Sequence, residues 1–385
     1  MKRFEPPLLF ALFLDLVGFG IMFPDIQLRA QEYGAPGWLI GLTLASYYLV
    51  QMAASPFWGR LSDRIGRKPV LLVCGGLSAL SMAIYAFSAN IGWIVVSRIL
   101  AGLGGANVAV AQAYIADAAD PEQRAGALGR MSAAISAGLV LGPSLGGFLA
   151  QAGGNFLLGI VAALASGIGV LWIMIAVPSL PPRRAGETPS GDRIPAIALF
   201  RGNPPLFRLF AVAVTGWFAL ACLEGTFGRL IQHNLGYGRL EFGILLSLEA
   251  GVAVIQGAIY PFLAKRLCEE TLLRIAYVLQ TIGLGLMPFA PDFPSLVVLS
   301  IAFGFGVGIA NPTINSRASH LVSPERQGSV FGLLQSSRAF GFLVGPMIGG
   351  TLFDWNSAAP YLLGGATMLL AAFAVRSSSP PAKRI

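Results

Sequence analysis

Charged side chains are scarce in this sequence of 385 residues: Asp, Glu, Lys and Arg together make up 11%, whereas apolar residues make up 55%. A soluble domain carries about 25% charged residues. So few charges cannot cover the surface of a water-soluble protein of this size. The high apolar content also excludes an intrinsically disordered chain. The composition therefore indicates a protein that is solvated mostly by lipid.

Cysteine and histidine are equally rare, with three cysteines (Cys74, Cys222 and Cys268) and two histidines (His233 and His320). Their wide spacing gives neither a metal-binding pattern nor a disulfide pattern. We therefore expect no metal, no cofactor and no enzymatic activity. The net charge of +8 does not indicate nucleic-acid binding, because the basic residues fall in small groups between apolar runs.

Most of the sequence consists of long apolar runs. A bilayer core about 30 Å thick needs about 20 apolar residues per helix. On that scale the chain holds twelve candidate spans. We predict an all-α membrane protein with twelve transmembrane helices in two pseudo-symmetric bundles of six, and the spans are 8–28, 38–58, 70–89, 91–115, 127–150, 156–177, 206–230, 240–264, 271–290, 295–319, 328–352 and 358–376.

The distribution of basic residues predicts the orientation of these spans. If both termini are cytoplasmic, the inner segments hold 21 of the 26 Lys and Arg residues, and the outer segments hold 3. Arg98 and Arg338 fall within spans. Because cytoplasmic loops carry the excess of Lys and Arg, we expect both termini in the cytoplasm.

An internal repeat divides the chain into halves. A shift of 203 residues aligns Gly142-Pro143 with Gly345-Pro346, together with several neighbouring glycines. The longest polar stretch lies between the repeats. Two six-span halves around a midplane site are the plan of many secondary transporters. We predict a first bundle at 1–177, a cytoplasmic linker at 178–205 and a second bundle at 206–385.

The loop after the second span combines glycines, one acid and a basic cluster. It runs from Gly59 to Pro69. The glycines permit a tight turn between antiparallel helices. We expect Asp63 to bond to backbone N–H groups or to an arginine, and Arg67 to lie near Asp117. The predicted gating motif consists of Gly59, Asp63, Arg64, Gly66, Arg67, Lys68 and Asp117.

This loop resembles the signature loop of the major facilitator superfamily. Three further stretches resemble its drug:proton antiporter branch, most of all the bacterial tetracycline/proton antiporter group; they are residues 14–24, 98–106 continuing to 113–117, and 138–147. The resemblance implies a multi-pass protein of the bacterial inner membrane that carries small molecules. The second half has no good copy of the signature loop.

Glycines in the fifth span recur every four residues, which gives a smooth stripe where another helix can approach closely. Proline in the same span would bend or loosen the helix. We interpret this segment as a helix-packing motif, with a direct role in antiport left open. It comprises Gly138, Gly142, Pro143, Gly146 and Gly147.

Ionisable residues inside the spans are costly and therefore point to function. We place the coupling protons on Glu224 and Glu249, because burial favours the neutral form of a carboxyl. Asp25 is the next candidate. Arg98 is expected to be buried against the first span, bonded to Asp25 or to backbone carbonyls near Gly20. Arg338 could pair with Glu249 instead, which would make that pair structural.

The resemblance implies that spans four and ten line the cavity. The polar candidates on these spans are Asn107, Gln112, Asn311 and Asn315, and Trp217 and Phe227 are candidate aromatic walls. Interhelical hydrogen bonding or a lipid-facing position is the alternative for each of them.

The leading functional hypothesis is a proton-coupled secondary transporter that exports hydrophobic or amphipathic small molecules by alternating access. Its partners would be the substrate, protons and the lipid bilayer, with no nucleic acid, and we expect a monomer. The alternatives are a lysolipid or amphiphile carrier, or a metabolite uniporter or symporter of the same fold. A receptor or scaffold that transports nothing would not need to retain costly membrane carboxylates.

Overall fold

The computed structural model describes residues 5–181, 200, 203–323 and 326–375, which contain only helices and their connections. Residues 182–199 and 201–202, most of the predicted linker, lie outside this part of the chain. The helices are α1 (Glu5–Glu32), α2 (Gly37–Ile65), α3 (Arg67–Ala86), α4 (Ile91–Gly104), α5 (Asn107–Ala118), α6 (Pro121–Ala176), α8 (Pro204–Leu235), α9 (Arg239–Arg266), α10 (Glu269–Leu286), the 3-10 helix η1 (Met287–Phe289), α11 (Phe293–His320), α12 (Gln327–Trp355) and α13 (Ala359–Ala374).

Nine segments of the described chain are long and apolar enough to cross a membrane. Helix α6 is long enough for two spans, because non-helical backbone at Gly153 and Gly154 divides it. Helices α4 and α5 together form one span. With α12 and α13 added, the predicted twelve spans are all present as helices.

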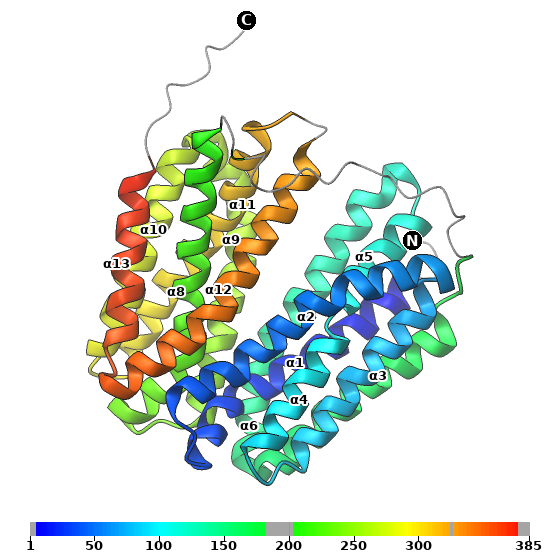
Figure 1. Ribbon diagram of the computed structural model, residues 1–385, viewed down its shortest axis with the longest axis horizontal. Helices are drawn as coiled ribbons and strands as arrows, with labels where there is room; N and C mark the ends of the chain where they lie inside the picture. Colours follow the sequence, from blue (N-terminus) through cyan, green and yellow to red (C-terminus); the bar gives the residue numbers. More distant parts are fainter. Residues whose placement is uncertain (1–4, 182–199, 201–202, 324–325, 376–385) are drawn as a thin grey trace, which may run out of the picture.

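The helices form two groups, which we call the first half (α1–α6) and the second half (α8–α13) (Figure 1). The start of α1 and the end of α13 lie at the same end of the molecule (Figure 1), which we call the terminal end. The opposite end holds the α1–α2 and α8–α9 connections, and we call it the joined end. In Figure 1 the two halves lie side by side at the joined end and diverge toward the terminal end.

Glycine stripes hold each half together in equivalent ways. A Cβ on Gly138 of α6 would lie 2.9 Å from the Phe13 carbonyl oxygen of α1. A Cβ on Gly345 of α12 would lie 2.6 Å from Ala221 Cβ of α8. These close approaches leave no room for a side chain, so the packing predicted for the fifth span is confirmed and is repeated in the eleventh.

The halves meet at the joined end through helix backbones. Gly37 and Gly41 of α2 lie against Gly350 and Pro346 of α12, where any added Cβ would collide with backbone. On the other side, the Ser144 amide of α6 donates to the Ser247 hydroxyl of α9 over 2.9 Å. The two halves are therefore in direct contact at this end.

Candidate functional site

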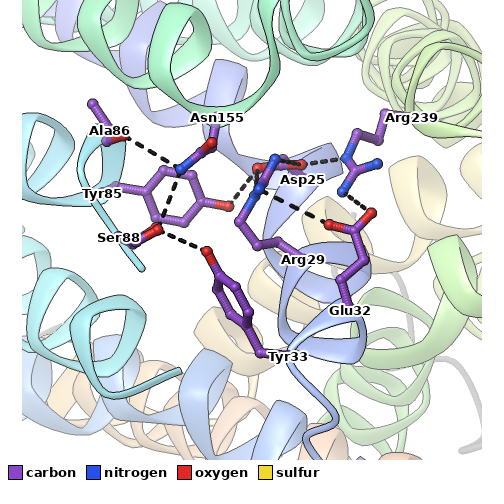
Figure 2. Close-up of polar contacts among 9 residues, drawn as sticks. All are labelled: Asp25, Arg29, Glu32, Tyr33, Tyr85, Ala86, Ser88, Asn155 and Arg239. Carbon is purple, nitrogen blue, oxygen red and sulfur yellow. Dashed lines mark hydrogen bonds and ion pairs between the residues drawn. The ribbon is translucent and has the colours of Figure 1, made fainter. Parts of the chain in front are cut away.

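An ion-pair network joins the two halves around Asp25, whose side chain is fully buried (Figure 2). Arg29, one turn further along α1, donates to this carboxylate over 2.9 Å. Tyr85 of α3 donates its hydroxyl over 2.7 Å. Arg239, the first residue of α9, pairs with Asp25 and also binds Glu32 over 2.7 Å. Arg239 therefore ties the second half to α1.

A second set of contacts crosses between the halves nearby. Arg229 of α8 forms an ion pair with Asp354 of α12 over 2.6 Å and donates to Gln31 of α1 over 3.0 Å. Asp354 also accepts the backbone N–H of Gly37 in α2 over 2.5 Å. The side chain of Gln27 in α1 bonds to the backbone of α8. The joined end is thus closed by polar contacts as well as by packing.

A small cavity of about 10 Å³ lies between the halves below this network. Its walls are mostly aromatic, and two charged residues, Glu224 and Arg98, reach it; the other lining residues are Phe19, Phe23, Ile26, Leu44, Tyr47, Tyr48, Phe342 and Pro346. The Tyr48 hydroxyl faces the Glu224 carboxyl. The cavity therefore brings together one acid, Glu224, and one base, Arg98, and its walls come from α1, α2, α4, α8 and α12.

Arg98 was expected to bond to Asp25 or to backbone carbonyls near Gly20, and among the described residues it does neither. Arg98 is buried against α1, as predicted, but its Nη2 donates to Met22 Sδ over 3.4 Å and to Ser97 Oγ over 3.2 Å. Its Nε has no hydrogen-bond partner among the described residues. The Asp25 carboxylate already binds Arg29, Arg239 and Tyr85, so its charge is balanced without Arg98.

The suggested pairing of Arg338 with Glu249 is also wrong. Helix α12 packs mainly against α8 and α2, so the Arg338 guanidinium lies over the Trp217 ring of α8, 4.9 Å from its centroid. Within the described chain, Arg338 forms no ion pair with Glu249. Its charge acts on Glu224 instead.

Glu249 lies in the interior of the second half. Ser300 of α11 lies beside it, yet neither Glu249 Oε1 nor Ser300 Oγ has a hydrogen-bond partner among the described residues. The Glu224 charge also acts on this carboxyl. Glu249 Oε1 is therefore a buried acceptor for which no described donor is found.

The other predicted cavity residues are dispersed. Trp217 and Asn311 line a cavity of about 20 Å³ inside the second half. Asn107 lines a separate cavity in the first half. Gln112 and Asn315 are exposed. Phe227 is fully buried in the apolar core, with its ring at right angles to that of Phe242, so it lines neither cavity.

The predicted gating loop lies at the terminal end. Gly66 connects α2 to α3 with φ 96°, which only glycine adopts easily. Arg67 then folds back to bind Asp63 over 2.7 Å and Asp117 of α5 over 2.8 Å. Both predicted contacts are confirmed. Arg67 also donates to Ser62 over 2.5 Å, so all of these partners belong to the first half.

Several residues of the joined end escaped the sequence analysis, namely Gln27, Tyr85, Arg229, Arg239 and Asp354. In the sequence analysis, Arg229 and Arg239 served only as two of the 3 basic residues of the outer segments, and no contact was predicted for them. The i, i+4 spacing of Asp25 and Arg29 was a usable signal. No comparable signal exists for Arg239, which lies 214 residues from Asp25.

The comparisons with known proteins agree with this architecture. The family model described as Major Facilitator Superfamily matches residues 8–338 and 226–385. The chain belongs to the major facilitator superfamily. Its members are membrane transporters of small molecules, so the expectation of a transporter rather than an enzyme is confirmed.

Relatives within this superfamily match nearly the whole chain. The quinolone resistance protein NorA of Staphylococcus aureus is 27% identical over 368 residues, which cover 94% of this chain and 93% of NorA. Multidrug resistance protein 1 of Bacillus subtilis is 26% identical over 366 residues, with coverage of 94% and 93%.

Solved structures share the superfamily fold. The crystal structure of the nucleoside transporter NupG has a TM-score of 0.79 at 16% identity and covers 97% of this chain and 98% of NupG. The human organic anion transporter MFSD10 has a TM-score of 0.67 at 23% identity, with coverage of 97% and 99%. At these identities the likeness concerns the fold alone.

Proposed function

We propose that this protein is a proton-coupled exporter of hydrophobic or amphipathic small molecules in the bacterial inner membrane. The quinolone and multidrug resistance proteins among its relatives support export of drug-like compounds. The observation that carries the proposal is the position of Glu224, a membrane acid in an aromatic cavity between two halves whose described helices meet at one end and diverge toward the other. Aromatic walls suit flat apolar substrates, and the acid suits a proton or a cationic group.

The orientation follows from the charge distribution. With 21 basic residues on the side of the termini and 3 on the other, the terminal end faces the cytoplasm. The joined end then faces outward, and the structure corresponds to an inward-facing state. We assign the gating motif to the cytoplasmic closure of the opposite state. The bundles at 1–177 and 206–385 are the bodies that would rock against each other.

The coupling protons are assigned to Glu224 and Glu249. Glu224 reaches the cavity itself, and Glu249, a half-buried acid, has a buried carboxyl oxygen with no partner among the described residues. Arg98 provides the positive charge on the opposite wall of the cavity. Asp25 fits a gate better than a proton carrier, because it binds Arg29 of its own helix and Arg239 of the other half.

Transport by purified protein in proteoliposomes tests this assignment. Under an imposed pH gradient, Glu224→Gln and Glu249→Gln should lose substrate accumulation, whereas substrate counterflow, which needs no net proton movement, should persist. Glu122→Gln is the matched control, because Glu122 is exposed at the start of α6. If both variants still accumulate substrate against a gradient, the protons are carried elsewhere. If the unmodified protein shows counterflow but no response to pH, a uniporter fits better.

A further inference from the structure

The fourth span is broken next to an acid that the proposed function does not use. Helix α4 ends at Gly104 and α5 begins at Asn107, with Gly105 and Ala106 as a turn between them. Two side chains of α2 bind carbonyls at the break: Trp58 Nε1 donates to Leu103 over 2.8 Å and Gln51 Nε2 donates to Gly105 over 2.7 Å. The break is therefore an integral part of the bundle.

Asp15 of α1 faces this break. Its Oδ1 accepts from Ser166 Oγ of α6 over 2.6 Å, and its Oδ2 accepts from Asn107 Nδ2 over 3.2 Å. The Ser78 hydroxyl of α3 lies close to the same carboxyl. Within the described chain, Asp15 forms no ion pair. One negative charge in the first half is thus surrounded by neutral oxygen and nitrogen groups from three helices.

The side-chain oxygen of Asn107 is a further possible ligand, because it accepts no hydrogen bond from the described residues. Its side chain is only 5% exposed, and its Oδ1 has no hydrogen-bond partner among the described residues. Asp15, Ser78 and Asn107 all line one cavity of about 60 Å³. A water occupies about 30 Å³ in the liquid, so this cavity has room for a small ion with a water ligand.

We propose that this cavity binds a sodium ion, with Asp15 as the charged ligand and Asn107 Oδ1, Ser78 Oγ and Ser166 Oγ as neutral ligands. Hard cations prefer carboxylate, carbonyl and hydroxyl oxygens. Discontinuous helices next to buried polar groups form sodium sites in other transporter folds. A proton would need only one of these oxygens, whereas Asp15, Ser78 and Asn107 all line one cavity and the Ser166 hydroxyl binds the same carboxylate.

The charge of the surroundings selects a monovalent ion. One carboxylate neutralises one positive charge, and a divalent ion would leave a net charge inside the membrane. Arg98 lines the same cavity and no ion pair between it and Asp15 is found in the described chain; its charge repels a divalent ion about twice as strongly as a monovalent one. This inference concerns ion binding by the first half and does not depend on the proposed proton sites, Glu224 and Glu249, which belong to the second half.

Sodium binding by the full-length protein in lipid nanodiscs tests the proposal. Thermal unfolding should shift upward by about 4 °C or more in saturating NaCl relative to choline chloride at equal ionic strength. Binding of radioactive sodium should saturate, and unlabelled sodium should displace it. Asp15→Asn should abolish both effects, whereas Glu122→Gln should retain them. Because Asp15→Asn could fail to fold, Asn107→Ala and Ser166→Ala provide a second measure, each weakening sodium affinity about tenfold.

Three results would overturn the proposal. Equal stabilisation by sodium and choline would mean an effect of ionic strength alone. Stabilisation by falling pH with no response to sodium would make Asp15 a proton site. Sodium binding that survives in folded Asp15→Asn protein would place the ion elsewhere. None of these readouts requires transport, so failure of the sodium proposal is distinguishable from failure of the proposed exporter.

Discussion

The two ends of this transporter use ion pairs in opposite ways. At the terminal end, the described ion pairs join helices of the same half: Arg67 binds Asp63 and Asp117, and Arg317 binds Glu270 over 3.2 Å. At the joined end, Arg239 of the second half binds two acids of the first half. The described ion pairs of the terminal end therefore act within one bundle, whereas those of the joined end act both within a bundle and between the bundles.

This difference predicts which substitutions change conformation and which change only stability. Spin labels on Trp93 of the first half and Trp355 of the second half, both at least half exposed at the joined end (50% and 81%), would report its opening by distance measurement. Labels on Ile65 and Cys268, exposed at the terminal end, would report the complementary closure. Each pair of labels would be introduced into a variant of the protein that lacks the other reactive cysteines.

Asp25→Ala should have the largest effect, because it leaves two arginines without their shared partner in a mostly buried network. Removing one member of a buried ion pair costs about 3 kcal/mol. Relative to the closed arrangement, the open form of the joined end should gain population by more than tenfold. Asp292→Asn is the matched control: Asp292 caps α11 at the same end, and its described side-chain hydrogen bond is to Ser295 of the same helix. An unchanged Trp93–Trp355 distance in Asp25→Ala would refute the gate.

Arg239→Gln should have a smaller effect in the same direction. It removes the ties to Asp25 and Glu32, but Arg29 still neutralises Asp25, and both Arg239 and Glu32 are partly exposed, at 20% and 48%. We expect a shift of about 1 kcal/mol, measured with the same labels. Arg266→Gln, at the other end of α9, should leave the distance unchanged. Equal shifts in both variants would indicate a general effect of charge.

Arg67→Gln should lower stability and leave the conformation unchanged, in contrast to the two variants of the joined end. Its partners all lie in the first half, so the variant should lower the unfolding temperature by a few degrees and leave both label distances of this state unchanged. Thermal unfolding and spin-label distances on the same sample decide the matter. A change in either distance would mean that the loop also acts between the halves in this state.

Salt should have the smallest effect. Exposed ion pairs are screened at a Debye length of about 8 Å at physiological ionic strength and of about 3 Å at 1 M. The Arg239–Glu32 pair is the more exposed tie, and screening should weaken it by a few tenths of a kcal/mol. High salt should therefore open the joined end slightly in the unmodified protein and not at all in Glu32→Gln.

Much of the fold was predictable because it depends on long apolar runs and on a repeat. Both are properties of the sequence itself. The break in the fourth span was not predicted, since residues 91–115 read as one continuous apolar run. Gly102, Gly104 and Gly105 were a signal, but glycine is common in membrane helices generally. The break also depends on donors from another helix, because Trp58 and Gln51 of α2 bind the carbonyls of Leu103 and Gly105.

The site was predictable in its residue types and less so in its pairings. Glu224 and Arg98 were singled out because charge is costly in a membrane, and both line the cavity. The partners of Asp25 and Arg338 were wrong in the sequence analysis, because they depend on which helices pack together. Helix α12 packs on α8 rather than on α9, and no residue pattern within either helix encodes that choice.

The backbone contact between α2 and α12 determines how the joined end can open. At Gly41 of α2 and Gly350 of α12 the nearest atoms of the facing helix all belong to its backbone, so a rotamer change alone cannot relieve or loosen the contact. A partial opening would separate the backbones without any flexible group to fill the space. Separation there must involve whole helices at once, which favours an abrupt transition between two states over a graded one. Single-molecule traces of the Trp93–Trp355 distance should then show discrete steps.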